Sequence, residues 1–129
     1  MTGSTSPALD VALACHEAWT SHDLEKAMSY IADDIVCDAP AGRLEGAAAY
    51  QDFMGPFVQI LTSSELVAAF GDEEKAVVVY DTETIPVKSA PGAECVTVKD
   101  GKITHSLFIF NRAPFDAARN KERSNSVGE

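Results

Sequence analysis

The chain has 129 residues, 46% of them hydrophobic, which is enough to bury the core of one domain without a disulfide or a metal. Twenty acidic against ten basic residues give a net charge of −10. Such a charge repels phosphate backbones and anionic lipids, so neither nucleic acid nor a membrane is expected as a partner. No apolar run approaches the roughly 18 residues that cross a bilayer, and residues 1–7 lack the features of a signal peptide. A cytoplasmic location is predicted.

The cysteines and histidines are scattered along the chain. Cys15, Cys37 and Cys95 are odd in number, and no C-x-x-C motif occurs. The sequence therefore indicates neither a disulfide framework nor a zinc site. We expect no metal site and no cofactor.

The first half of the chain has helical periodicity, with apolar residues at steps of three and four. Pro7 suits the first turn of a helix, and Asp23 is placed to cap a second one. Gly55-Pro56 should kink or interrupt the third. After a flexible leader at 1–7, helices are expected at 8–21, 24–31 and 47–61, with a short strand at 35–38.

Past Thr62 the pattern changes to the period of two that is typical of strands. Asp100-Gly101 is a strong hairpin signal. From Ala113 the chain becomes polar, and a disordered tail is expected over 113–129. Strands are expected at 65–71, 76–85, 93–99 and 102–111, which leaves a single domain at 8–112.

Helices segregated from an antiparallel meander define an α+β fold. A curved sheet covered by helices on one side leaves a central cavity, where ligand sites tend to occur.

Several short motifs resemble the nuclear transport factor 2-like superfamily, which contains SnoaL-like cyclases, ketosteroid isomerases and limonene epoxide hydrolases. The motifs are Trp19-x-x-His22-Asp23-Leu24, Ala32-Asp-Asp-Ile-Val36, Pro40-Ala-Gly42, Glu45-Gly46 and Asp100-Gly-Lys-Ile103. The resemblance implies a cone-shaped fold in which three N-terminal helices pack on a curved antiparallel sheet. It says little about chemistry, because this fold hosts catalysts and plain binders alike.

Strand alternation, combined with the resemblance, predicts which side chains face the cavity. On the last strand the face of Phe108 should look inward. On the two strands before it, Glu94, Val96 and Val98, and then Val77, Val79 and Asp81, should do the same. The predicted ligand-binding residues are Cys15, Trp19, Phe53, Met54, Phe57, Val79, Ser106, Phe108 and Phe110.

Asp81 and Glu94 are thus predicted as carboxyl groups that point into an apolar chamber. Burial raises the pKa of a carboxyl group, and a neighbouring carboxyl raises one of the pair further. Such a pair could supply a general acid and a general base near neutral pH. The alternative is that both lie at strand ends, in water or paired with Lys88 or Lys99.

Asp38 is a third catalytic candidate, since it resembles the position of a water-positioning amide in the epoxide hydrolases. Glu94 falls where the isomerases carry a protonated oxyanion-hole acid. Other family positions differ: the isomerase general base falls on Ala39, its oxyanion-binding tyrosine on Cys15, and the cyclases' catalytic aspartate on Phe108. Neither Val77 nor Val79 is the arginine of the epoxide hydrolases.

Three functions remain open. The first is a cofactor-independent acid–base enzyme acting on an apolar ketone, epoxide or polyketide-like metabolite. The second is a module that binds an apolar ligand without chemistry, and the third is a dimerisation element. A homodimer is expected in each case, through an outer sheet face made of Ile103, His105, Leu107 and Ile109.

Overall fold

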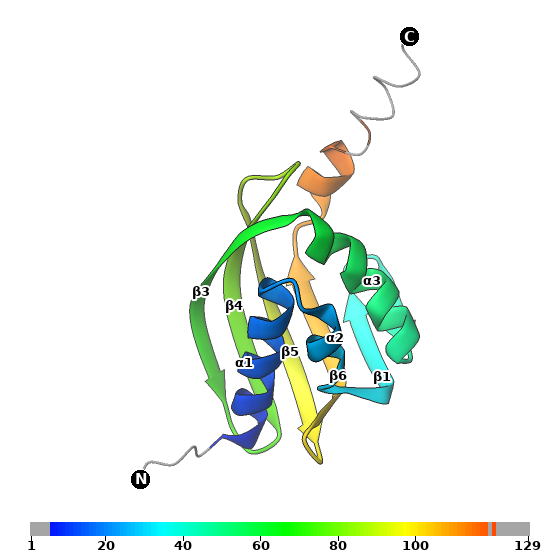
Figure 1. The fold of residues 1–129 in the computed structure, drawn as a ribbon, viewed down its shortest axis with the longest axis vertical. Helices are drawn as coiled ribbons and strands as arrows, with labels where there is room; N and C mark the ends of the chain where they lie inside the picture. The colour runs from blue at the N-terminus through cyan, green and yellow to red at the C-terminus, as the bar shows by residue number, and fades with distance from the viewer. Residues whose placement is uncertain (1–5, 119, 121–129) are drawn as a thin grey trace.

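The computed structural model describes residues 6–118 and 120, and shows helices α1, α2 and α3 covering one face of a curved sheet (Figure 1). The sheet has six strands in the order β2-β1-β6-β5-β4-β3. The elements are α1 (Pro7–Thr20), α2 (Leu24–Met28), β1 (Ile31–Ala39), β2 (Gly42–Glu45), α3 (Ala47–Ile60), β3 (Leu61–Gly71), β4 (Lys75–Thr84), β5 (Ala90–Lys99) and β6 (Lys102–Phe110).

The predicted α+β architecture, with helices on a curved sheet, is confirmed. Two details differ. Strand β1 begins at Ile31 rather than Ile35 and runs parallel to β6, so the sheet is mixed rather than wholly antiparallel. Gly42–Glu45, which the sequence assigned partly to a turn, forms β2 and pairs with β1. Helix α3 continues through Pro56.

Local sequence signals account for the ends of several elements. Ser6 begins α1, because its Oγ accepts a hydrogen bond from the Leu9 amide at 3.1 Å and donates one to the Asp72 carbonyl at 2.7 Å. Asp23 caps α2 as predicted, accepting from the Lys26 amide at 3.1 Å. Asp100 and Gly101 both have positive φ, 54° and 77°, as the tight β5–β6 hairpin requires.

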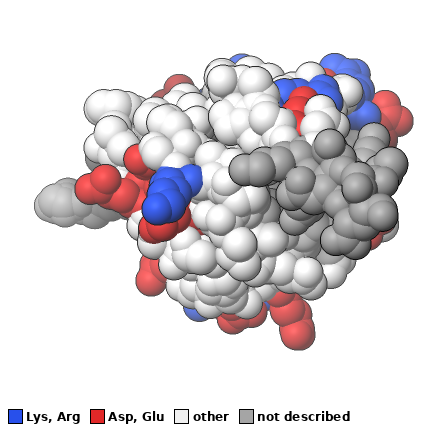
Figure 2. Space-filling view, turned by 90° about the horizontal axis from the view of Figure 1, so that it is seen from above, with Lys and Arg blue, Asp and Glu red and all other residues white. Residues whose placement is uncertain are grey.

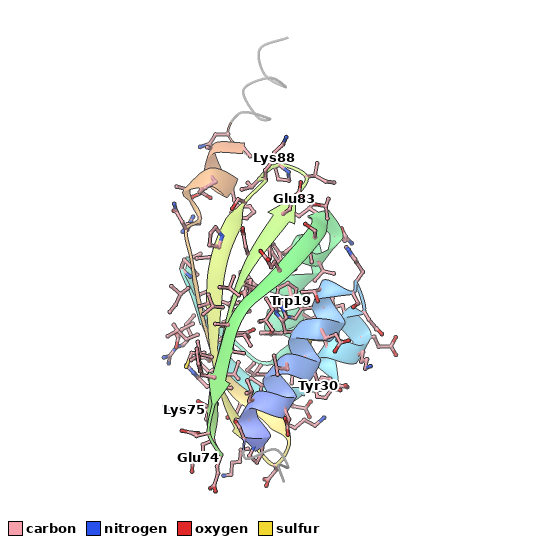
Figure 3. All side chains as sticks on the ribbon, turned by 90° about the vertical axis from the view of Figure 1, so that its left-hand side faces the viewer. Trp19, Tyr30, Glu74, Lys75, Glu83 and Lys88 are labelled. Atoms are coloured by element: carbon pink, nitrogen blue, oxygen red, sulfur yellow. The ribbon has the colours of Figure 1, made fainter. Side chains whose placement is uncertain are left out.

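Irregular pairing bends the sheet, and the curvature of β3 and β4 is visible from the side (Figure 3). Between β5 and β6 the register shifts, since Thr97 pairs with His105 but Val98 pairs with Ile103. Thr104 is therefore an extra residue, and a bulge of this kind reverses which side chains point inward. Ile103 is only 1% exposed. The prediction that placed Ile103 on the outer face was wrong for this reason.

Strand β4 carries its inward side chains at the even positions. Glu94 on β5 pairs directly with Val78, and residues directly paired across a ladder point to the same side. Val78, Tyr80 and Thr82 are buried accordingly. The predicted inward set of Val77, Val79 and Asp81 was wrong in parity, because Val77, Val78 and Val79 are all apolar and alternation could not separate the two faces.

The chain does not lose regular structure at Ala113, where the polar tail was expected to begin. Residues 113–118 are helical, and the Ala113 amide donates to Asn111 Oδ1 at 3.0 Å. The rest of that predicted tail, at 119 and 121–129, and residues 1–5 of the predicted leader lie outside the described residues. The leader was predicted to extend to Pro7, but Ser6 caps α1 and Pro7 is the first residue of that helix. Within the described part of the chain, no helix combines the length and the apolar character needed to cross a membrane.

Two glycines should respond oppositely to replacement by alanine. Gly101→Ala has room for the new methyl group but keeps a φ of 77°, so it should lower the free energy of unfolding by about 1 kcal/mol. Gly55→Ala lies inside α3 and, apart from its chain neighbours and the helix backbone, meets only Leu24 Cδ2 at 3.7 Å, so helix propensity should raise that free energy by about 0.5–1 kcal/mol. Urea denaturation of both variants measures this, and equal signs would contradict the assignment of these conformations.

Candidate functional site

A cavity of about 530 Å³ lies between α1, α3 and the concave face of the sheet. Its wall is mostly apolar and aromatic, and a volume of this size suits a small-molecule ligand. The residues in its wall are Trp19, Pro40, Ala41, Asp52, Phe53, Met54, Pro56, Phe57, Ile60, Tyr80, Thr82, Ala90, Gly92, Phe108, Phe110, Arg112, Phe115 and Asp116.

The rings of the wall hold one another in place. Trp19 lies 5.8 Å from Phe57 and 5.4 Å from Tyr80, and Phe53 lies 5.5 Å from Phe108, each distance joining ring centroids. These separations are in the range at which aromatic pairs attract. Figure 3 shows Trp19 reaching from α1 toward the interior. The helices and the sheet thus present a rigid set of flat apolar surfaces to the cavity.

Glu94 is buried, with 3% of its surface exposed, and pairs directly with Phe108 of the cavity wall. Its Oε2 accepts a short hydrogen bond from the Ser106 hydroxyl at 2.6 Å and a longer one from the Tyr50 hydroxyl at 3.5 Å. Burial raises the pKa of the Glu94 carboxyl to about 7, although the two hydroxyl donors oppose the shift. Near neutral pH this carboxyl therefore exists in both protonation states.

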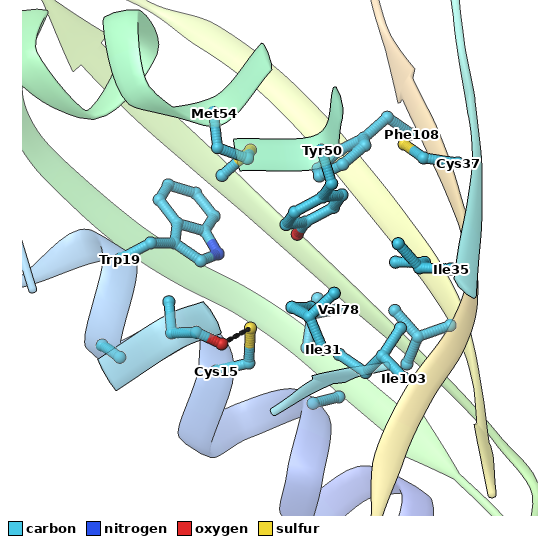
Figure 4. Packing of buried hydrophobic residues seen from close by; sticks show 14 of the residues in the cluster. Cys15, Trp19, Ile31, Ile35, Cys37, Tyr50, Met54, Val78, Ile103 and Phe108 are labelled. Atoms are coloured by element: carbon cyan, nitrogen blue, oxygen red, sulfur yellow. Dashed lines mark hydrogen bonds between the residues drawn. The ribbon is translucent and has the colours of Figure 1, made fainter. Parts of the chain in front are cut away.

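Two buried ring nitrogens on α1 have no hydrogen-bond partner among the described residues. They are Nε1 of Trp19 and Nδ1 of His16. The His16 and Tyr80 rings lie 5.0 Å apart, and burial lowers the pKa of His16 to about 4. In Figure 4 the indole nitrogen of Trp19 and the hydroxyl of Tyr50 face the same interior space. An unpaired buried N–H is costly, so this space favours an occupant that accepts a hydrogen bond.

Asp81 does not join Glu94. It lies on the opposite face of the sheet, where its Oδ1 accepts hydrogen bonds from the Ser89 hydroxyl at 3.0 Å and the Ala90 amide at 3.1 Å. These bonds fasten the chain as it enters β5. The two carboxyl groups that the sequence placed together in one chamber are separated by the sheet itself.

Asp38 also lies on the outer face, in an ionic cluster. Its oxygens contact Arg43 Nε and His105 Nε2, both at 2.9 Å. Hydrogen bonds from Arg43 and then from His105 lower the pKa of Asp38 to about 2. The cluster joins β1, β2 and β6 on the side away from the cavity.

The predicted ligand-binding residues fall in three places. Trp19, Phe53, Met54, Phe57, Phe108 and Phe110 are in the cavity wall. Cys15 and Ser106 are buried below it, where Cys15 Sγ donates to the Ala27 carbonyl at 3.6 Å and Ser106 donates to Glu94. Val79 is on the outer side of β4.

Sequence reasoning missed three features of this site. Tyr50 belonged to the predicted apolar stripe of α3, but nothing in the sequence showed that its hydroxyl reaches Glu94. Tyr80 and Thr82 were missed because the sequence placed the odd-numbered residues of β4 inward, whereas the even-numbered ones point inward. Phe115 lay in the presumed tail, where a single aromatic residue between Pro114 and Asp116 was the only available signal.

Among the described residues, no group of three or more His, Cys, Asp or Glu side chains is arranged to hold a metal ion.

Seen from above, acidic side chains are spread around the rim of the molecule and much of the remaining surface is uncharged (Figure 2).

The curved sheet, the three helices on its concave face and the cavity between them define the nuclear transport factor 2-like fold. The sequence model of the SnoaL-like domain matches residues 12–106, and the chain belongs to this family. No curated protein matched the chain.

Solved structures agree with this assignment. A protein from Kribbella flavida DSM 17836 is 52% identical, with a TM-score of 0.89 over 94% of this chain and 99% of that one. An NTF2-like protein of unknown function from Cytophaga hutchinsonii is 16% identical, with a TM-score of 0.71 over 89% and 99% of the two chains. TerC, co-crystallised with polyporic acid, is 20% identical, with a TM-score of 0.68 over 87% and 97%.

The raised pKa of Glu94 should make stability depend on pH. A carboxyl group whose pKa is higher in the folded state contributes stability that is complete below its unfolded pKa of about 4.5 and is lost as pH rises through about 7. The loss is on the order of 3 kcal/mol. Glu94→Gln cannot ionise, so the variant does not lose this stability. From pH 4.5 to 8 its unfolding free energy should therefore rise relative to that of the wild type.

Chemical denaturation at several pH values tests this. His16, whose pKa is lowered, acts with the opposite sign in part of the same window, but it is present in both proteins and cancels in the difference. A difference that stays constant across this range would show that Glu94 ionises normally in the folded protein.

Proposed function

We propose that this SnoaL-like domain is a cofactor-independent acid–base enzyme for an apolar, flat ketone of the polyketide-like kind, with Glu94 as its working carboxyl. The observation that carries the proposal is a buried carboxyl, held by Ser106 and Tyr50, on a residue that pairs directly with Phe108 of the aromatic cavity wall. Asp81 and Asp38 are given structural roles on the outer face. The hydrogen bonds that Asp81 accepts there and the ionic cluster of Asp38 support this division of roles.

The chemistry follows from the position of the pKa. A general acid or base is most effective when its pKa lies near the working pH, because both protonation states are then available. The ionised Glu94 carboxylate could remove a proton beside a carbonyl group, and the resulting acid could return the proton elsewhere on the substrate. Trp19 Nε1, which lacks a partner, is a suitable donor to the developing enolate oxygen.

Glu94 itself is not in the cavity wall. A ligand can therefore reach it only if the floor of the cavity, the part of the wall nearest Glu94, moves. Met54 lies in the wall and is 2% exposed. Figure 4 places it beside the gap between Trp19 and Tyr50. Its unbranched side chain has more rotational freedom than the rings around it, so Met54 is the floor residue that we expect to move when a ligand enters.

The aromatic wall supports a flat ligand, because stacked and edge-on contacts favour planar rings. TerC, which shares the fold, was co-crystallised with polyporic acid. We extend this kind of ligand to the present chain on the basis of the wall. The net charge of −10 favours a neutral molecule over an anionic one.

Exchange of the protons beside a ketone tests the proposed reaction. In heavy water, the full chain should accelerate deuterium incorporation beside the carbonyl of 2-tetralone, as followed by proton NMR. The rate should rise with pH through about 7, as Glu94 ionises. Glu94→Gln should lower the accelerated rate by about 100-fold, within the range that general bases contribute.

Asp81→Asn is the matched control, since it alters a carboxyl group on the outer face and should leave the exchange rate unchanged. Equal losses in both variants would point to a general effect on folding. Exchange that is unaffected by Glu94→Gln would remove Glu94 from the reaction.

A second function, binding without chemistry, is favoured by one observation: Glu94 is 3% exposed and lies outside the cavity wall. On this alternative, 2-tetralone would quench the fluorescence of Trp19, which is the chain's single tryptophan, without any accelerated exchange. The two readouts therefore separate an enzyme from a binder.

We also propose a homodimer through the outer face of β6. Leu107 and Ile109 are exposed there, at 38% and 57%, next to the cluster of Asp38 and His105. Exposed apolar side chains grouped on one face favour association. Sedimentation equilibrium at micromolar concentration should show a dimer that Leu107→Glu dissociates, whereas a wild-type monomer would rule the interface out.

A further inference from the structure

The segment that follows β6 reaches back over the cavity. Phe115 lies in the helical residues 113–118, and its ring centroid is 6.4 Å from that of Phe57 on α3 and 6.1 Å from that of Phe110 on β6. Both pairs are edge-on, at interplanar angles of 66° and 86°. Figure 1 shows this segment in orange, beyond the end of β6 and near the C-terminal end of α3. Phe115 thus bridges the two sides of the cavity.

Two polar contacts lie within the segment itself. Asn111 Oδ1 accepts from the Ala113 amide at 3.0 Å, and Arg112 Nε contacts Asp116 Oδ2 at 3.1 Å. An exposed pair of this kind contributes little stability. Arg112, Phe115 and Asp116 of this segment are in the cavity wall. Phe115 is the apolar one of the three, so its ring is the part of the segment that an apolar ligand would meet.

We infer that residues 111–118 close one end of the cavity and that Phe115 determines the length of ligand that fits. This inference rests on the proposed function only in that the cavity takes a flat apolar ligand. The Phe115 ring stands in the end wall of the cavity. It therefore excludes a ligand that is long enough to reach past Phe57 and Phe110. The same ring must move aside, or rotate with its segment, before a bound ligand leaves past it.

Phe115→Ala removes the ring and keeps the backbone. The cavity should then lengthen by about one aromatic ring, and the exit should open. Phe115→Leu, which retains apolar bulk without a flat ring, should lie between wild type and alanine. Phe70→Ala is the matched control, because Phe70 is 70% exposed on β3 and is not part of the cavity wall.

The probes are two neutral aromatic ketones of different length, 1-acetonaphthone and 1-acetylpyrene. Quenching of Trp19 reports their binding directly, because Trp19 is the single tryptophan and lies in the wall. Stopped-flow displacement from the full chain gives the dissociation rates. Phe115→Ala should release both ketones about tenfold faster. It should also raise the affinity of the longer ketone relative to the shorter by about tenfold, because the longer ketone then buries roughly one more ring against apolar side chains.

The outcomes separate the two proposals. If wild type binds the ketones and Phe115→Ala matches it in both the rates and the affinity ratio, the closing role is wrong while the cavity remains a ligand site. If wild type quenches with neither ketone, the cavity is not such a site and the closing role falls with it. Melting curves check that each variant is folded, and Phe115→Leu carries the test should Phe115→Ala unfold.

Discussion

The hydrogen bond from Ser106 to Glu94 is the interaction on which the interior depends. An ionisable carboxyl has been placed where burial disfavours its charge, and the adjacent elements hold it there through one hydroxyl on β6 and another on α3. Removing either hydroxyl would leave a buried acid with less compensation. The position is determined by the pairing of β5 with both neighbours, because Glu94 lies between Val78 and Phe108 in the ladder. The strand register therefore also determines where the Glu94 carboxyl lies.

The sheet separates two polar systems of different character. Inside, Glu94, Tyr50 and Ser106 form a network shielded from water, in which proton position can change with little movement of atoms. Outside, Asp38, Arg43 and His105 form an ionic cluster that water screens. The inner network suits chemistry on an apolar molecule, whereas the outer cluster links three strands. Strand alternation together with the pairing register assigns each carboxyl to one system or the other.

The sequence predicted the elements well because local signals mark most of them. Asp23, the Asp100-Gly101 pair and the apolar stripe of α3 are each recognisable from a few neighbouring residues. Each therefore predicts its element from the sequence alone. The parity of β4 was not predictable, since consecutive valines carry no alternation and the register is determined by long-range pairing. The bulge at Thr104 was equally invisible, and it moved Ile103 into the core. Glu94 was placed inward correctly because β5 alternates cleanly and the bulge opposite it lies beyond Thr97, away from Glu94.

The hydrogen bond between Ser6 and the carbonyl of Asp72 joins residues 66 positions apart. Gly71 permits the approach, as a side chain there would come within 2.7 Å of the Ser6 hydroxyl. The first helix therefore finds its docking surface only after the β3–β4 hairpin has been synthesised. Docking of α1 on the sheet thus depends on contacts that are distant in sequence, and contacts of this kind slow the folding of a domain.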